Sequence, residues 1–511
     1  MRTFARKVDL RSKQATMRFF AIVGANKGVL NPKGIPLIAQ PFFLPNPKGV
    51  FCHNLQKNNS KNDVSIDTVF PLCYNYNMIA TLVIFAITVA AMIVCVLFFP
   101  KLKLGKISVD TYWLVTLAGA VVLLCLKLAD IGAVVDALVA DSAINPLKIL
   151  VLFISMTVLS IFLDELGFFR FLASVALKKA RTGQIKLFLY LYVTVSVLTV
   201  FTSNDVIILS FTPFICYFAK NAKISPIPYL AAEFVAANTW SMALVIGNPT
   251  NIYLATSYGL NFVDYVKISI LPTLAAGIVA VAMLFLMFRK KLRDPISGEA
   301  EEVVIEDKWL LWVGIVHLAV CTVLLAVGSY VGLEMWLISA GAVVSLFVFA
   351  AVTALVRKQK PKELLGCLKR APYQLVPFIL SMFVMIVALG QQGVTAKLAQ
   401  FFQGELPILK YGTLSFLASN VINNIPMSVL FSSVIESANA SLPAVFATII
   451  GSNVGAFLTP IGALAGIMWS SILNKHGEKF GYVDFLKMGV IVAIPSLFAA
   501  LGALWLVFLF V

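Results

Sequence analysis

Charged residues and the side chains that build enzyme centres are scarce in this chain. Of its 511 residues only 13% are Asp, Glu, Lys or Arg, only three are His, and the seven Cys lie singly with no CxxC pair. Neither a disulfide framework nor a thiolate metal site is therefore indicated. The segments HExxH, GxSxG and GxxxxGK[ST] are also absent, which argues against an intramembrane protease or transferase and against ATP use by the chain itself. We predict no enzymatic activity, no metal and no cofactor.

Apolar residues, in contrast, dominate the composition. The chain is 60% hydrophobic with a mean hydropathy of +0.92, more than a soluble core of this size could hide. We therefore expect a multi-pass protein of the cell (inner or plasma) membrane. The net charge of +16 does not indicate a nucleic-acid partner, because the Lys and Arg cluster in short loops between apolar runs, where they report orientation.

Residues 1–77 differ from the rest of the chain. They carry eleven Lys or Arg, three Asp and two copies of NPKG, so we predict a basic extension with little stable structure. The span that follows opens at Met78, and the basic loop after it is assigned to the cytoplasm, which would leave the extension outside, against the positive-inside rule. One interpretation is that translation begins at Met78. A targeting segment fits less well, because no short apolar core with a small-residue cleavage site follows these charges.

Eight apolar runs are long enough to be predicted as membrane spans. Basic loops beginning near Lys178, Arg289 and Arg357 are assigned to the cytoplasm, and the stretches 130–145 and 329–332, which lack Lys and Arg, to the outside. The runs lie near 78–99, 111–129, 147–164, 266–288, 309–328, 333–356, 374–390 and 488–510.

The segment TSND, at Thr202 to Asp205, interrupts two further apolar runs. The second run is only about 14 residues, or ~21 Å of helix, which is too short to cross a bilayer comfortably. Both outer flanks are basic, so we predict a re-entrant hairpin that enters from the cytoplasm with TSND at its tip; two complete spans are the alternative. An acid at that depth is tolerated mainly where it serves ions, water or protein, which singles out Asp205. Its alternative role is to accept a hydrogen bond from a neighbouring backbone N–H.

The second half of the chain repeats the first. "SMTVLSIFLDELGFFRFLA" from Ser155 aligns without gaps on "SMFVMIVALGQQGVTAKLA" from Ser381, and "NTWSMALVIGNPTNIYLA" from Asn238 matches "NVGAFLTPIGALAGIMW" from Asn453. We predict an all-α polytopic membrane protein with two inverted repeats, 78–288 and 309–511, joined by a cytoplasmic linker at 289–308. Inverted repeats with paired re-entrant hairpins and broken helices are the architecture of secondary transporters.

Each predicted repeat has two interruptions, a hairpin tip (TSND; SNVINNIP) and a mid-helix break (IGNPTN; FLTPIG). Gly and Pro unwind a helix there, so freed carbonyls, amide oxygens and half-helix N-termini can bind an ion or a polar solute. The alternative is that these residues only kink or cap helices. The candidate substrate- or ion-binding residues are Thr202, Ser203, Asn204, Asp205, Asn248, Pro249, Thr250, Asn251, Ser419, Asn420, Asn423, Asn424, Thr459 and Pro460.

Other ionisable residues in apolar surroundings have two interpretations each. Asp164 and Glu165 are further candidates for the coupling acid, or they lie at the membrane interface. Glu233 and Lys127 form an internal pair or lie at interfaces. For His317 we favour a packing role over a proton carrier.

These motifs resemble the ion transporter superfamily, and within it the ArsB-type arsenical pump membrane proteins. The similarity runs over most of residues 78–510 and is carried by "LDELGFFRFLA", "TSNDVIILSFTPFI", "NVINNIPM" and "GSNVGAFLTPIGALAGIMW". One segment, "IGNPTNIYLA", is nearer to the NPTN signature of citrate, sodium/proton and P-protein-like relatives. The resemblance implies a transporter, and an associated ATPase subunit or a homodimer are candidate assemblies.

Three hypotheses follow from different classes. The first is a secondary transporter coupled to H⁺ or Na⁺, which either exchanges arsenite (or another inorganic anion) for protons or imports citrate, a dicarboxylate or another anion. The second is a sodium/proton antiporter, and the third, an intramembrane enzyme, lacks its motifs. No Lys or Arg lies inside the hairpin tips or the mid-helix breaks, so a di- or trianion would meet net repulsion unless cations bound with it. As(OH)₃ is neutral at pH 7 and needs only the donors and acceptors that Asn, Ser and Thr supply.

Overall fold

The computed structural model describes residues 66–99, 101–104, 107–140, 145–180, 183–293 and 304–510. Residues 1–65 lie outside the described residues, so the extension and the alternative start at Met78 stay predictions. The first helix, α3 (Ile66–Phe98), begins well before Met78, and the last part of the predicted extension is therefore helical. All of the described residues belong to one compact unit of the chain.

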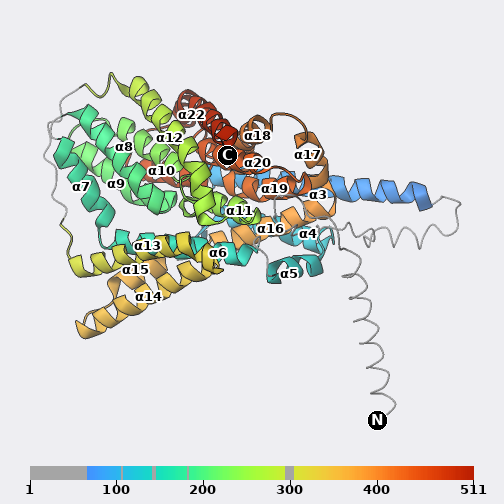
Figure 1. The fold of residues 1–511 in the computed structure, drawn as a ribbon, viewed down its shortest axis with the longest axis horizontal. Helices are drawn as coiled ribbons and strands as arrows, with labels where there is room; N and C mark the ends of the chain where they lie inside the picture. The colour runs from blue at the N-terminus through green and yellow to red at the C-terminus, as the bar shows by residue number, and fades with distance from the viewer. Residues whose placement is uncertain are drawn as a thin grey trace, which may run out of the picture. The chain divides into compact units, whose positions relative to one another are not determined.

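Helices make up almost all of the described chain, as predicted (Figure 1). The exception is an antiparallel hairpin of β1 (Lys101–Leu104) and β2 (Ile107–Asp110), which forms in the basic loop after α3. The helices of the first half are α4 (Thr111–Cys125), α5 (Ile131–Val139), α6 (Pro146–Glu165), α7 (Phe168–Ala180), α8 (Gln184–Phe201), α9 (Asn204–Asn221), α10 (Ile227–Trp240), the 3₁₀ turn η1 (Val245–Gly247), α11 (Pro249–Ser257) and α12 (Phe262–Phe288).

The second half continues the helical pattern. Its elements are α13 (Lys308–Gly328), η2 (Ser329–Val331), α14 (Met335–Val356), α15 (Lys362–Arg370), α16 (Leu375–Gln391), α17 (Val394–Phe402), α18 (Pro407–Ile422), α19 (Asn424–Ser437), α20 (Leu442–Gly455), α21 (Leu464–Lys475) and α22 (Tyr482–Phe510).

Eight of the described helices are long and apolar enough to cross a membrane. Seven include or overlap predicted spans. The predicted span 111–129 is wrong in length, because α4 has only 15 residues and a separate helix, α5, occupies the stretch assigned to an outer loop. The eighth is α8, the first arm of the predicted hairpin. Its partner α9 is not among the eight, although it has the same 18 residues as α8. The prediction of a second arm of only about 14 residues is therefore wrong, because the polar residues at both ends of α9 are also helical.

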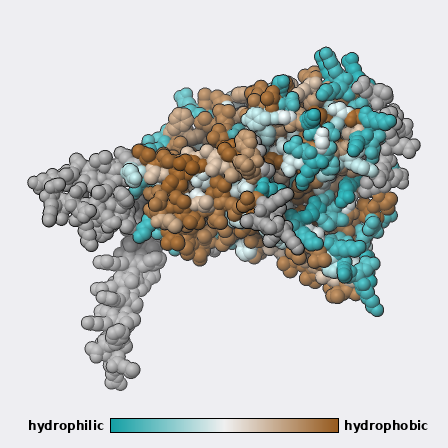
Figure 2. Space-filling view, turned by 180° about the vertical axis from the view of Figure 1, so that it is seen from behind, coloured by the Kyte–Doolittle hydropathy of each residue, from teal (hydrophilic) through white to brown (hydrophobic). Residues whose placement is uncertain are grey.

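The interior is built by helices from both halves. α12 packs along α22, α18 along α20 and α8 along α10, while α6 lies among α13, α14 and α15 (Figure 1). Outward faces stay apolar: Trp312, Val316, Val320 and Val323 on α13 are exposed at helical spacing. Figure 2 shows broad hydrophobic areas on one face of the molecule, with hydrophilic groups gathered toward one side. Apolar residues that face outward in this way suit contact with lipid.

Candidate functional site

Two helices, one in each repeat, break at equivalent positions. α10 ends at Trp240 and α11 begins at Pro249; α20 ends at Gly455 and α21 begins at Leu464. In each repeat an Asn, either Asn238 or Asn453, precedes the helix end by two residues. Pro249 occupies the first position of its half-helix, where a missing N–H costs nothing. Pro460, in contrast, lies within the irregular segment before α21, so it interrupts the chain without starting the new helix.

The predicted hairpin tips also lie at breaks between helices. α8 ends at Phe201, and α9 begins at Asn204 with Ser203 in extended conformation at its N-cap. In the second repeat α18 ends at Ile422, and Asn423 is the N-cap of α19. The second tip is therefore Asn423, whereas Ser419 and Asn420 lie in the last turn of α18.

An amide cluster joins the two repeats. The side chain of Asn453, from α20, accepts hydrogen bonds at Oδ1 from Asn248 Nδ2 and Ser241 Oγ, both at 3.0 Å. Its Nδ2 donates to Asn251 Oδ1 at 2.6 Å and to the Ile449 carbonyl at 2.8 Å. All four of these polar side chains are buried, and Asn251 and Asn453 are 0% exposed. The NPTN break of the first repeat is thus completed by a residue of the second.

The cluster continues to the first hairpin tip. Ser241 Oγ also lies 2.9 Å from the Asn238 carbonyl, so its single proton is shared between this oxygen and Asn453 Oδ1. Asn204 Nδ2 donates to Asn238 Oδ1 at 3.1 Å. Asn251 Nδ2 donates to the Ser241 carbonyl at 2.8 Å. One continuous hydrogen-bond network therefore runs from the start of α9 to α20.

The second hairpin tip docks on the second mid-helix break. Thr459 Oγ1 donates to Asn420 Oδ1 at 2.7 Å, and Asn420 Nδ2 donates to the Gly455 carbonyl at 3.0 Å. Asn423 Nδ2 donates to the Ile461 carbonyl at 2.9 Å, and the backbone N–H of Asn424 donates to the Gly462 carbonyl at 3.0 Å. Because Asn453 and Gly455 share the end of α20, the structure brings all four predicted breaks to one place.

Asn423 adopts a backbone conformation that is normally reserved for glycine. Its φ of 71° and ψ of 153° are strained for a residue with a Cβ. Such strain costs on the order of 1–3 kcal/mol and persists where the surrounding structure over-determines it. Here the Asn423 side chain donates to the Ile461 carbonyl and accepts from the Ile425 N–H. The segment before α21 and the start of α19 therefore both fix the conformation of Asn423.

Several buried polar atoms at the breaks have no hydrogen-bond partner in the described part of the chain. Buried polar atoms are normally satisfied, so each exception calls for a ligand, an ion or water. Those at or beside the four breaks are Ser203 Oγ, Thr239 Oγ1, Thr250 Oγ1, Asn424 Oδ1 and Ser452 Oγ. Thr202 is different, since its hydroxyl donates to the Leu198 carbonyl at 2.8 Å.

Asp205 lies in the first turn of α9 and is half-buried. The positive end of the helix dipole favours a carboxylate at that position. Its backbone N–H is capped by Asn204 Oδ1 at 3.0 Å. Among the described residues no side-chain ion pair or hydrogen bond to its carboxylate is present, so the carboxylate is available to a proton or a cation.

A family model described as a citrate transporter matches residues 108–448, about two thirds of the chain. The chain belongs to this transporter family. An arsenical pump membrane protein of Escherichia coli is 29% identical over 382 residues, 69% of this chain and 84% of that protein, and one of strain K12 is 27% identical over 388 residues with the same shares. Among solved structures, the YdaH transporter of Alcanivorax borkumensis has a similar fold, with a TM-score of 0.50 at 14% identity over 85% of this chain and 98% of that one. The protein is therefore a multi-pass secondary transporter and not an enzyme.

The transporter's two other candidate coupling acids are held by an arginine. Arg370, from α15, donates from Nη2 to Asp164 Oδ2 at 2.6 Å and from Nη1 to Glu165 Oε1 at 2.7 Å. Gly366 makes room for the Glu165 carboxylate, because a Cβ there would lie 2.2 Å from Glu165 Oε2. No hydrogen bond or ion pair of the described residues joins these acids to the four breaks. They form a link between α6 and the second repeat.

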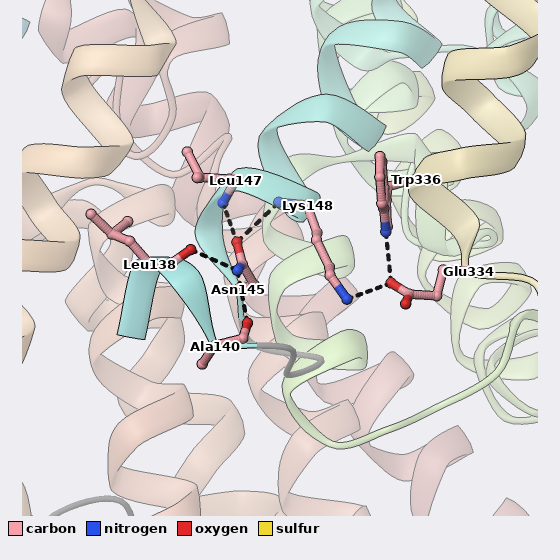
Figure 3. Close-up of polar contacts among 7 residues, drawn as sticks. All are labelled: Leu138, Ala140, Asn145, Leu147, Lys148, Glu334 and Trp336. Carbon is pink, nitrogen blue, oxygen red and sulfur yellow. Dashed lines mark hydrogen bonds and ion pairs between the residues drawn. The ribbon is translucent and has the colours of Figure 1, made fainter. Parts of the chain in front are cut away.

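A third ion pair fixes the opposite end of α6. Asn145 caps its N-terminus by accepting from the Leu147 and Lys148 N–H groups, and Lys148 Nζ lies 2.7 Å from Glu334 Oε2, which also accepts from Trp336 Nε1 at 2.6 Å (Figure 3). The sequence assigned this end of α6 and the segment before Glu334 to the outside, and the Arg370 end to the cytoplasm. At each end of α6, the ion-paired residues are therefore ones that the sequence assigned to the same side of the membrane.

The structure also decides between the two interpretations given for Glu233 with Lys127 and for His317. Glu233 is fully buried while Lys127 is exposed, so the two do not pair. His317 contacts the Val313 carbonyl through Nδ1 at 2.7 Å and Ser345 Oγ through Nε2 at 3.1 Å. Its ring nitrogens are satisfied locally, which agrees with a packing residue.

Sequence reasoning missed three residues of the network and the arginine. Asn238, Ser241 and Asn453 flank the predicted breaks, and their position in the aligned repeats, with Asn238 on Asn453, was a usable signal. Arg370 carried no such signal, because it lies in a segment with many other cations, and only folding brings it to α6.

Proposed function

We propose that this transporter exports arsenite in exchange for protons, with the four helix breaks as its binding site. The relatives reported above that are named arsenical pump membrane proteins support this substrate. The continuous network from Asn204 through Asn453 is the structural observation on which the proposal mainly rests. The site comprises the predicted residues of the breaks together with Asn238, Ser241 and Asn453.

The chemistry of the network suits a neutral polyol-like solute. Arsenous acid presents three hydroxyl groups, each a donor and an acceptor, and amides and hydroxyls satisfy both functions. No Lys or Arg takes part in the hydrogen-bond network of the breaks among the described residues, so a di- or trianion would lack a counter-charge. Arg370 does not supply one, because Asp164 and Glu165 occupy it. Thiolates are not needed, since an exporter must release what it binds.

Asp205 is the proposed coupling acid. Its carboxylate lies at the start of α9, one residue from the network, and binding of a proton or a cation offsets the cost of removing its charge from water. If Asp205 binds a proton from one side of the membrane and releases it to the other, proton movement is coupled to the conformation of the predicted hairpin. Sodium is the alternative coupling ion.

The family description supports a second candidate, a Na⁺- or H⁺-coupled symporter of citrate or another di- or tricarboxylate. Everted membrane vesicles carrying a pH-sensitive dye separate the candidates when arsenite, citrate and sodium are offered in turn. Arsenite alone should relieve acidification. Relief by citrate alone would show that the substrate is a carboxylate. Relief by sodium alone would show that the protein is a Na⁺/H⁺ antiporter.

We also propose that the repeats, 78–288 and 309–511, are inverted in the membrane. The last helix of each repeat, α12 or α22, begins at a matched segment and has an acid, Asp264 or Asp484, in its first turn. Single Cys at these two positions, in a Cys-free background, should react with impermeant thiol reagents from opposite faces. Labelling of both from one face would contradict inversion.

A further inference from the structure

Glu233 is a buried acid at a meeting point of both repeats, and the proposed site makes no use of it. It lies on α10 and is 0% exposed. Thr212 Oγ1 of α9 lies 3.1 Å from its Oε1 and 3.2 Å from its Oε2. Trp469 Nε1 of α21, from the second repeat, donates to Oε2 at 3.3 Å. Three helices therefore converge on one carboxyl group.

The surroundings of Glu233 favour a neutral acid. Other ionisable side chains of this region are the buried thiol of Cys216, one turn beyond Thr212 on α9, and Glu478, which follows α21. Tyr229, one turn before Glu233, donates its hydroxyl proton to Gln184 of α8 at 2.7 Å. No described residue of α8, α12 or α20, which also pack against α10, places a charge beside the acid. An ionised carboxylate with two neutral partners and no cation is costly to bury, so a proton is the natural occupant.

A metal cation fits this place less well than a proton. Hard cations take several oxygen ligands, and Thr212 and Glu233 supply few. Trp469 points an N–H donor at the same carboxyl group, where a cation would need a further acceptor.

Glu233 is connected to the proposed site by one helix and to the second repeat by another. Asp205 and Thr212 are seven residues apart on α9, which places them on the same side of the helix about 10 Å apart. Trp469 belongs to α21, the half-helix that follows the FLTPIG break, and its ring packs on Phe234 and Phe485. At the equivalent position of α20, five residues before Asn453, the second repeat has Thr448 instead of an acid.

We propose that Glu233 is a second proton-binding site of the transporter, and that its neutral form holds α21 against α9 and α10 through Trp469. Loss of the proton leaves a buried charge and favours an arrangement in which the three helices separate and water enters. This inference rests on the proposed proton coupling, with Asp205 as the partly accessible acid and Glu233 as the buried one.

Infrared difference spectra of the purified protein between acidic and alkaline pH test the inference without any substrate. The wild type should show the carbonyl band of a protonated carboxyl group in the apolar interior, and Glu233→Gln, which keeps the hydrogen-bonding shape, should lose that band. Asp205→Asn should retain it. In vesicles, Glu233→Gln should lose arsenite transport driven by a pH gradient and retain gradient-free arsenite exchange.

The inference is overturned if Glu233→Gln leaves the band and the coupled transport unchanged. Should that variant fail to fold, Trp469→Phe takes its place, because it removes the N–H donor and keeps an aromatic ring. The carboxyl band should then shift, and an unshifted band would also overturn the inference. A Glu233 band in a wild type that moves no arsenite would keep the proton site and reject the proposed substrate.

Discussion

Asn453 of the second repeat donates its amide to Asn251 of the first at 2.6 Å, so a residue of the second repeat completes the broken helix of the first. The same side chain accepts from Asn248, and neither partner has solvent to replace it. A binding site built this way depends on the relative position of the two repeats. Movement of one repeat against the other would change its amide geometry directly.

Asn453→Ala should therefore impair both folding stability and transport. It leaves the amides of Asn248 and Asn251 short of a buried partner, at a cost of about 1–3 kcal/mol for each unsatisfied group. Thermal unfolding in detergent and arsenite efflux measure the two effects. Asn474→Ala removes an exposed amide near the end of α21 and serves as the control, with both properties unchanged. Normal transport by the Asn453 variant would show that the contacts between Asn453 and the first repeat are not part of the binding site.

Asp205→Asn should insert and fold but lose coupling. The substitution keeps the shape and the cap at the start of α9 while removing the titratable group, so gradient-driven efflux should vanish, its pH or Na⁺ dependence should flatten, and exchange should persist. Asp205→Glu should be partly active with a shifted ion affinity. Asp136→Asn, at an exposed position on α5, is the matched control. Unchanged pH dependence in Asp205→Asn would make the acid structural.

Arg370→Gln should destabilise the transporter more than Lys369→Gln. Asp164 is buried and would lose its counter-charge, whereas Lys369 is exposed. Because the Arg370 side chain is itself 33% exposed, we expect about 1–3 kcal/mol, less than for a fully buried pair. Asp164→Asn combined with Arg370→Gln should recover part of the loss. Equal unfolding temperatures for the Arg370 and Lys369 single variants would show that the ion pairs contribute nothing measurable.

Asn423 allows strain and binding to be separated. Asn423→Gly relieves a backbone strain on the order of 1–3 kcal/mol but removes the contact with the Ile461 carbonyl, so its stability should stay near wild type while transport falls. Asn423→Ala keeps the strain and loses the contact, and should be the less stable of the two. It should still respond to pH, because no titratable group is lost. Full transport by Asn423→Gly would mean that the tip side chain is only structural.

The sequence was informative wherever local chemistry determines structure. Pro249 at a helix start, the mismatch in hydropathy between α8 and α9, and the register of the two broken helices all follow from residues close together in the chain. The hairpin between Lys101 and Asp110 and the shortness of α4 were missed, because apolar composition alone does not say where a helix stops. The pairing of Arg370 with Asp164 could not be predicted, since more than two hundred residues separate the partners and many other cations compete.

The central claim is that arsenous acid is held by amide and hydroxyl oxygens and nitrogens at the junction of the repeats. X-ray absorption at the arsenic edge, on purified protein equilibrated with arsenite, reads the atoms bonded to arsenic directly. The account predicts saturable arsenic with an oxygen-only first shell in the wild type, and loss of the bound arsenic in Asn453→Ala. Sulfur in the first shell, or equal arsenic on the wild type and the Asn453 variant, would contradict it.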